Sequence, residues 1–205
     1  LSFFAVHGGV PDDGIQVPAA LGLPAAALAG QSYADDMAGV SGTAAGLQRI
    51  IDRVHEHSQT WGWTANTGKS VVMVFGDPAT HAAAADATWH WGAAALKRVA
   101  STKYLGLHFH EDCTWQEHAT RTAQKAAAAV HIWAPVLASA RLPVALKRDV
   151  IATRIRPIIE YGMEVWAPEH GGCRKALLSP LDAVLEDAGR LACGLGSGRS
   201  RAAWA

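Results

Sequence analysis

The sequence of 205 residues is poor in cysteine and in charge of either sign. Its three cysteines form no CxxC pair and are too few for a disulfide framework, which argues against a structural zinc site and is typical of a reducing compartment. Charged residues make up 18% of the chain and hydrophobic residues 50%, which excludes a highly charged disordered protein. We expect an intracellular protein, located in the nucleus or the cytoplasm.

The sequence also lacks a convincing hydrophobic run of membrane-spanning length. One uncharged segment, residues 14–34, is long enough, but Pro18 and Pro24 interrupt it and most of its residues are Ala, Gly or polar. We interpret this segment as a surface loop and expect no membrane partner. The chain begins at Leu1 rather than Met and shows no signal-like run, so we expect a piece of a longer protein.

Net charge is zero, but the charges are unevenly distributed. Residues 1–66 hold six acidic and two basic side chains, net −4, whereas residues 136–205 hold seven acidic and ten basic ones, net +3. An acidic front and a basic back would suit a metal site followed by a surface that tracks phosphates. Differences of this size also arise by chance.

Hydrophobic periodicity predicts an α+β half followed by an all-α half, with the boundary near residue 112. The first half is expected to contain a hairpin at 31–40, an amphipathic helix at 43–61 capped by Thr43 and ended by Gly62, and strands at 69–75 and 103–110. Residues 1–30 favour neither a strand nor a helix. The segment 76–100 is ambiguous, with a strand or turn expected around 93–99.

The second half shows the helical period throughout. A long helix is predicted from residue 114 to Leu137, and a second helix begins at Pro143. Pro157 should kink or end that second helix because proline lacks the N–H that a helix interior needs. A third helix is predicted from about Pro180 to Cys193.

The tip of the predicted hairpin carries two adjacent carboxylates, Asp35 and Asp36. Neighbouring carboxylates repel each other, and a divalent cation with a preference for hard oxygen ligands, such as Mg²⁺ or Mn²⁺, relieves that repulsion. Taken alone, two aspartates in a turn are more often solvated.

Five short segments follow one another along the chain and carry a further pattern. They are LSFF at residues 1–4, YADD at 33–36, Asn66 with Lys69 and Ser70 before a strand, KYLGL at 103–107, and RIRPIIEYGMEVWAP at 154–168. In this order they resemble the reverse transcriptases of non-LTR (LINE-type) retrotransposons. In that family the YADD hairpin precedes an amphipathic helix, an Asn-x-x-Lys-(Ser/Thr) element, a primer-grip segment and a P-x-x-x-Y-G-x-x-x-W signature.

The resemblance implies a role for each matching residue. Asp35 would be a metal ligand of the polymerase site and Asp36 a second, weaker or indirect one, with Lys69 near the incoming triphosphate and Tyr33 beside the primer terminus. Further implied contacts to nucleic acid are a primer-holding turn and basic residues on the helical half: Tyr104, Leu105, Gly106, Lys147 and Arg148.

The resemblance also implies an architecture and an activity. Residues 1–112 would be part of a polymerase palm, and residues 113–205 a thumb of about three helices. The activity would be RNA-directed DNA synthesis by two-metal nucleotidyl transfer, with an RNA template, a DNA primer and deoxynucleotides as partners. The aspartate-bearing strand and the nucleotide-gripping fingers of the family have no counterpart in these 205 residues, so we expect the chain to be inactive alone.

Other interpretations of the same residues remain open. The chain could be a non-catalytic nucleic-acid-binding remnant of a degenerate retroelement, or a helical interaction module whose YADD is coincidental. Lys69 could be a solvated flank of a strand, Tyr104 and Leu105 could be core residues, and Lys147 with Arg148 could be a solvent-facing pair. We interpret most of the tryptophans, Trp115 and Trp133 among them, as packing residues.

Overall fold

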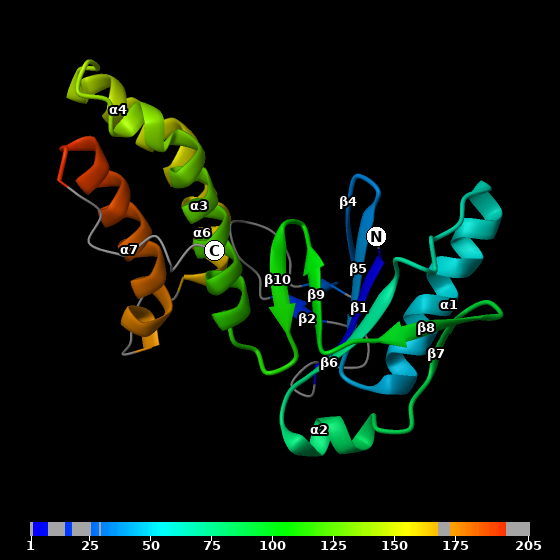
Figure 1. The fold of residues 1–205 in the computed structure, drawn as a ribbon. Helices are drawn as coiled ribbons and strands as arrows, with labels where there is room; N and C mark the ends of the chain where they lie inside the picture. Colours follow the sequence, from blue (N-terminus) through cyan, green and yellow to red (C-terminus); the bar gives the residue numbers. More distant parts are fainter. Residues whose placement is uncertain (1, 8–14, 18–25, 29, 168–172, 196–205) are drawn as a thin grey trace. The chain divides into compact units, whose positions relative to one another are not determined.

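The computed structural model describes residues 2–7, 15–17, 26–28, 30–167 and 173–195. The chain divides into two compact units, Leu1–Thr114 and Trp115–Ala205, close to the boundary expected at residue 112 (Figure 1). Strands and helices mix in the first unit, and the described part of the second unit contains helices only. The predicted mixed α+β class is therefore confirmed.

A six-stranded sheet forms the centre of the first unit. Its order is β4 (Gly30–Tyr33), β5 (Asp36–Ser41), β1 (Ser2–His7), β6 (Val71–Phe75), β8 (Ala94–Arg98) and β7 (Trp89–Trp91). β1 pairs in parallel with both β5 and β6, and β6 pairs in parallel with β8. Antiparallel strands β4 and β7 close the two edges.

The N-terminal part of the chain is more structured than its composition indicates. Residues 2–7 form an inner strand, because pairing on both sides satisfies the backbone of an apolar segment whose Phe4 is buried. β2 (Ile15–Val17) and β3 (Ala26–Leu28) make a separate two-stranded antiparallel sheet. The interpretation of residues 14–34 as a loop was thus wrong for β2 and β3, whereas β4 belongs to the hairpin predicted over residues 31–40.

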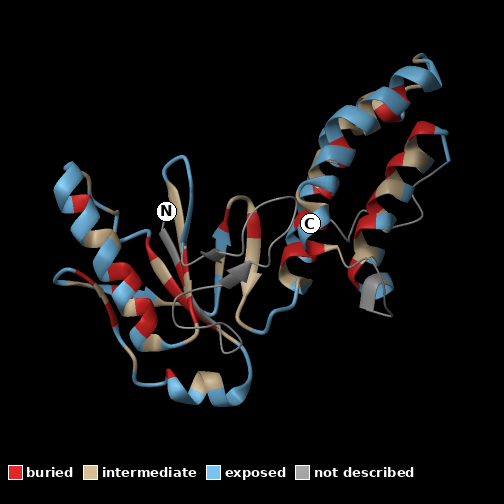
Figure 2. Cartoon of the chain, turned by 180° about the vertical axis from the view of Figure 1, so that it is seen from behind, coloured by how far each residue is buried: buried red, intermediate tan, exposed pale blue. Residues whose placement is uncertain are grey.

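The predicted amphipathic helix is α1 (Ala44–Trp61), which covers one face of the sheet. The Thr43 hydroxyl accepts a hydrogen bond from the Gly46 backbone N–H at 3.0 Å, and Gly62 ends the helix with a φ of 70°. The buried residues gather where the helix meets the central strands and β7 (Figure 2), with Leu47, Ile51, Val72, Val74 and Trp89 at the centre.

A second hairpin covers the opposite face. β9 (Ser101–Tyr104) and β10 (Leu107–His110) join through Leu105 and Gly106, whose φ angles of 45° and 85° are those of a tight primed turn. Tyr104 packs on Met73, while the neighbours of Met73 in β6 face α1. The prediction of one continuous strand over 103–110 was wrong. The alternation of apolar and polar residues continues through the two-residue turn, so the sequence pattern does not reveal the turn. The ambiguous segment 76–100 holds α2 (Pro78–Ala83), β7 and β8.

The second unit is built on two long helices, α3 (Gln116–Leu137) and α7 (Cys173–Ala192), which pack against each other. Small residues of α3 allow a close approach to the apolar face of α7, with Ala119, Ala123, Ala126, Leu181 and Val184 buried. α7 begins seven residues before the predicted start and contains Pro180. A proline costs a helix interior one hydrogen bond, and packing of the apolar face of the helix can offset that cost.

The segment between those helices shows how proline is accommodated. Pro143 precedes α4 (Val144–Val150), as predicted. A π-helical turn, Ile151–Ile155, then leads into α5 (Arg156–Glu160), in whose first turn Pro157 lies. The wider π-helical turn accommodates Pro157, which has no backbone N–H to donate to the preceding turn. The helix therefore changes its hydrogen-bond pattern before Pro157 and does not end there. α6 (Met163–Trp166) follows, and its Trp166 is buried. No helix in the described ranges is both long and apolar enough to cross a membrane.

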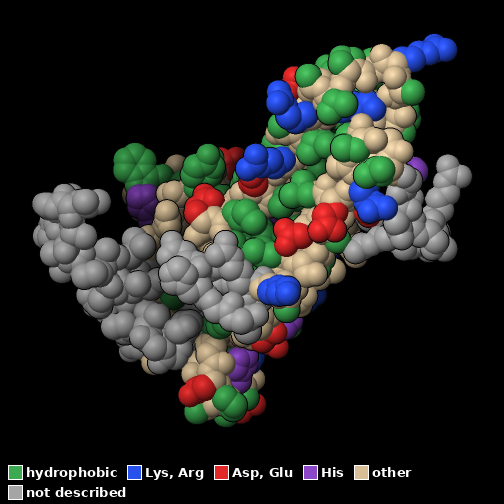
Figure 3. Space-filling model, turned by 90° about the vertical axis from the view of Figure 1, so that its left-hand side faces the viewer, with side chains coloured by type: hydrophobic (Ala, Val, Ile, Leu, Met, Phe, Trp, Pro, Cys, Tyr) green, Lys and Arg blue, Asp and Glu red, His purple; other side chains and the backbone are tan. Residues whose placement is uncertain are grey.

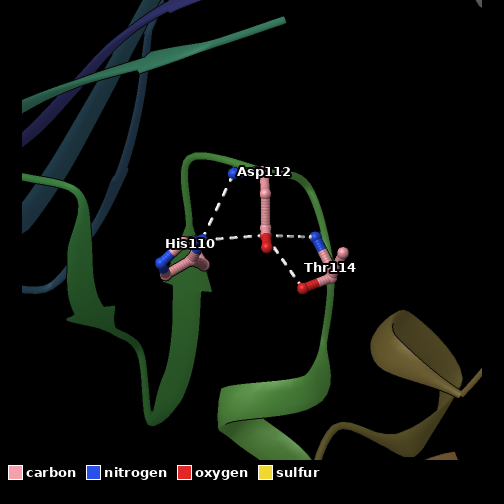
Figure 4. Close-up of polar contacts among 3 residues, drawn as sticks. All are labelled: His110, Asp112 and Thr114. Atoms are coloured by element: carbon pink, nitrogen blue, oxygen red, sulfur yellow. Dashed lines mark hydrogen bonds and ion pairs between the residues drawn. The ribbon is translucent and has the colours of Figure 1, made fainter.

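The first unit ends in a polar turn after β10 (Figure 4). One carboxylate oxygen of Asp112 accepts hydrogen bonds from the backbone N–H and the hydroxyl of Thr114, both at 2.8 Å, and lies 2.8 Å from Nδ1 of His110. Partial burial raises the pKa of Asp112, but the hydrogen bonds from Thr114 and His110 outweigh it and the net pKa lies below the ordinary value of 3.8.

We predict a pH-dependent contribution of Asp112 to stability. A lowered pKa in the folded state stabilises the protein above pH 3.8, and this stabilisation is lost as the pH falls through the folded-state value. Urea denaturation should show wild type more stable than Asp112→Ala at pH 7, with the difference shrinking below pH 3.8. Asp86→Ala, at another exposed turn, is the control. A difference that is constant with pH would contradict the assignment.

Candidate metal and nucleic-acid site

The YADD segment forms the predicted hairpin tip. Tyr33 pairs with Asp36 across β4 and β5, so Ala34 and Asp35 make a two-residue turn. Ala34 adopts a φ of 51°, in the left-handed region that alanine enters only at a cost. The ring of Tyr33 is 68% exposed and Asp35 is exposed as well. The tip therefore presents an aromatic ring and a carboxylate outward.

The two aspartates serve different faces of the sheet. Asp35 lines a cavity between the hairpin and α1. Asp36 has the strand parity of Ala38, which packs on the other face against the Met73–Tyr104 cluster. Burial raises the pKa of the Tyr104 phenol, and the negative charge of Asp36 raises it further, which puts Asp36 on the β9–β10 side.

The predicted primer-holding turn thus lies on the same face as Asp36. Leu105 packs partly buried against the cluster of Met73 and Tyr104, and Gly106 supplies the positive φ of the turn. Tyr104 itself is buried, so its ring is a support for the turn. Leu105 and Gly106 remain partly accessible.

Lys69 reaches the same edge of the sheet by topology. Because β5, β1 and β6 run in parallel, the residues that precede β5 and β6 lie at the same end of these strands. One strand, or about 10 Å, separates them. Lys69 precedes β6 in an exposed turn, in which its backbone N–H donates to the Asn66 carbonyl at 2.9 Å. Within the described chain no hydrogen bond or ion pair joins Lys69 to either aspartate.

Asp35 and Asp36 carry the hard oxygen donors that a divalent ion takes, although the two residues belong to opposite faces of the sheet. Mg²⁺ keeps several waters and commonly takes one or two carboxylates together with phosphate oxygens. In the part of the chain that the structure describes, no group of three His, Cys, Asp or Glu side chains lies close enough to hold a metal. β1, the other neighbour of β5, has no acidic residue. The described residues supply two carboxylates and no third.

The structure corrects the role expected for Lys147. This side chain is only 5% exposed, and its ammonium group donates to the carbonyl of Ala192 at the end of α7, at 3.1 Å. It is therefore a buried helix cap, occupied by a carbonyl, and not a phosphate contact. Arg148 is exposed, with Asp149 at 3.6 Å.

The other basic residues of the second unit do not form a continuous track on the face that Figure 3 shows, where Lys and Arg side chains alternate with Asp, Glu and apolar ones. Arg154 lies over the ring of Trp133, 5.8 Å from its centroid, and Arg156 pairs with Glu160. His118 is buried, with its ring 6.1 Å from Trp115 and 5.0 Å from Trp166. The packing role predicted for Trp115 agrees with that contact.

Sequence reasoning missed the cavity beside α1 and the rings around it. Trp61 is 71% exposed, so it is not the packing residue that the sequence predicted. The available signal was the stripe of Ile50, Arg53, Val54 and His57 at helical spacing, which mixes apolar and basic residues on one face.

No family model, curated protein or solved structure matches the chain.

We predict that Ala34→Gly stabilises the hairpin. Glycine removes the left-handed strain but costs backbone entropy, so the net gain should be up to about 1 kcal/mol in the free energy of unfolding. Chemical denaturation measures it, with Ala38→Gly in the neighbouring strand as a control that should destabilise. A loss of stability on Ala34→Gly would contradict the positive φ.

We predict that Lys147→Ala lowers the free energy of unfolding by about 1–3 kcal/mol, because the Ala192 carbonyl loses a charged donor in a buried position. Arg148→Ala, the exposed neighbour, should change it by less than about 0.5 kcal/mol. Thermal and urea denaturation of both variants test this. Unchanged stability of Lys147→Ala with weakened nucleic-acid binding would restore the phosphate-contact role.

Proposed function

We propose that the chain is part of an RNA-directed DNA polymerase of the non-LTR retrotransposon type, carrying out two-metal nucleotidyl transfer with Mg²⁺ or Mn²⁺. The observation that carries this proposal is that Asp35 in the exposed turn, Asp36 at the start of β5 and Lys69 before β6 lie at the same end of the parallel strands, with the turn after Tyr104 on the face of Asp36. The order of the sequence motifs supports the same proposal.

Each residue then has a physical task. Asp35, with Asp36 as a second ligand, would hold a divalent ion, whose chemistry would be to offset negative charge on the triphosphate. Lys69 would neutralise negative charge developing on the leaving pyrophosphate. The turn at Leu105 and Gly106 would hold the primer strand, with the exposed ring of Tyr33 beside its terminus.

In this proposal the first unit is a partial palm and the helical second unit is a thumb. Arg148 remains the candidate contact to the phosphates of a template–primer duplex from the predicted pair, and Lys147 acts only through the stability of α7. Since the described residues supply two carboxylates, we expect this chain alone to bind a metal weakly and not to extend a primer.

One observation favours a second candidate, a non-catalytic nucleic-acid-binding or helical interaction remnant. The strand beside the aspartate hairpin, β1, offers no further carboxylate. A binding remnant needs none. The two candidates differ in metal binding at the hairpin, which a catalytic ancestor requires and a remnant does not.

The metal proposal is tested by titrating the full chain with Mn²⁺ and following free Mn²⁺ by electron paramagnetic resonance. Asp35→Asn and Asp36→Asn should each weaken binding by at least about ten-fold, because each removes a charged ligand. Asp86→Asn, an exposed aspartate of the same unit, should leave it unchanged. Equal Mn²⁺ affinity in all four proteins would reject the metal site and leave the remnant.

A further inference from the structure

A cavity of about 830 Å³ lies on the α1 face of the sheet, between the β4–β5 hairpin and the C-terminal half of α1. This volume is in the range of small-molecule sites. Its apolar lining comes from both layers, with Phe4 and Met37 from the sheet and Ile50 and Val54 from the helix. The cavity therefore offers a surface on which a flat apolar group could be desolvated.

One arginine and one histidine lie on the same face of α1 as Ile50 and Val54 and also line the cavity. Arg53 follows Ile50 by three positions and His57 follows Val54 by three, so all four share one face of α1, and all four line the cavity. The Arg53 guanidinium makes no hydrogen bond or ion pair with any described residue. A permanently charged fork left without a partner at a cavity suits an anion, and its planar geometry matches phosphate oxygens.

The cavity that Arg53 lines also has an aromatic lining. Trp63 lines the cavity, and its ring lies 6.4 Å from that of His57 and 6.0 Å from that of Trp91. Trp91 is buried and is contacted edge-on by His55 at 5.3 Å. Rings held from behind in this way provide a rigid surface for stacking a planar ligand.

Hydrogen-bonding groups complete the lining. Gln31, Thr64 and Asn66 contribute amide and hydroxyl groups, and Asp35 contributes a carboxylate. The side-chain amides of Gln31 and Asn66 make no hydrogen bond with described residues, so donors and acceptors are available for the edge of a heterocycle. An anion, a planar ring and a polar ring edge together are the chemistry of a nucleotide.

We propose that this cavity binds a nucleotide unit, with the phosphate on Arg53, the base against Trp63 and the base edge towards the amides of Gln31 and Asn66. The cavity lies on the opposite face from Tyr104, so the proposal does not depend on polymerase activity. A free nucleotide and one nucleotide of a single strand present the same groups. Trp61, exposed and 5.9 Å from His57, would stack the next base of a strand.

Binding is measured with the full chain by calorimetry for AMP and by fluorescence anisotropy for a fluorescein-labelled oligoadenylate of twelve nucleotides. Arg53→Gln should weaken AMP binding by at least about ten-fold. Trp63→Leu should weaken it by about five- to one-hundred-fold. Lys97→Gln, an exposed lysine of the same unit outside the cavity, should have no effect.

Two further variants distinguish loss of the ligand contact from loss of folding, and a single strand from a free nucleotide. Trp63 packs against the core, so Trp63→Phe is included as a variant that keeps an apolar ring; it should fold with a similar melting temperature and weaken AMP binding less than leucine does. Trp61→Leu should weaken the oligonucleotide alone if a strand is the natural source, and neither probe if the source is a free nucleotide.

The proposal is overturned by any of three results: no binding of either probe to wild type, equal affinities of wild type and Arg53→Gln, or ribose 5-phosphate binding as tightly as AMP. The first two reject the cavity as an anion site. The third removes the role of the base and of Trp63. Because Asp35 lines the cavity as well as the proposed metal site, Mn²⁺ binding by wild type and Asp36→Asn is the measurement that distinguishes failure of the metal site from failure here.

Discussion

The parallel pairing of β1 between β5 and β6 is the constraint on which the rest of the first unit depends. It places the N-terminal ends of β5 and β6 at one edge of the sheet, and α1 must then run back across a face to connect them. The hairpin tip and Lys69 share an edge for this reason, although they are more than thirty residues apart in the sequence.

Strand alternation turns that single sheet into two chemically different faces. One face carries α1, a large cavity and a run of aromatic rings; the other carries the β9–β10 hairpin and the buried Tyr104. Asp35 and Asp36 are adjacent in sequence but belong to different faces, and the effect of Asp36 on the pKa of Tyr104 is felt on only one of them. The two aspartates of one sequence motif thus lie on opposite faces of the sheet, because side chains alternate along a strand.

What could be predicted from the sequence depends on whether the cause is local. The cap at Thr43, the stop at Gly62 and the hairpin at Asp35 follow from neighbouring residues, and all three were predicted. β1 could not be, because its stability comes from strands far along the chain. The burial of Lys147 was missed for the same reason, since its partner, the Ala192 carbonyl, is forty-five residues away. Nothing within one helical turn distinguishes it from exposed Arg148.

The two units differ in how their basic side chains are paired. In the second unit, Arg121, Arg148, Arg154 and Arg156 each have a carboxylate or a ring as a neighbour, and Lys147 is occupied by a carbonyl. In the first unit, Arg53 and Lys69 have no such partner among the described residues, and they lie at the cavity and at the aspartate edge respectively. Desolvated or partnerless cations are where an anion gains most, because no existing pair has to be broken first. The sequence predicted an acidic front and a basic back, yet Arg53, which lines the cavity, lies within the acidic segment 1–66, and Lys69 follows that segment directly. Net charge by segment therefore does not by itself point to the proposed anion site, and the pairing of individual side chains has to be considered with it.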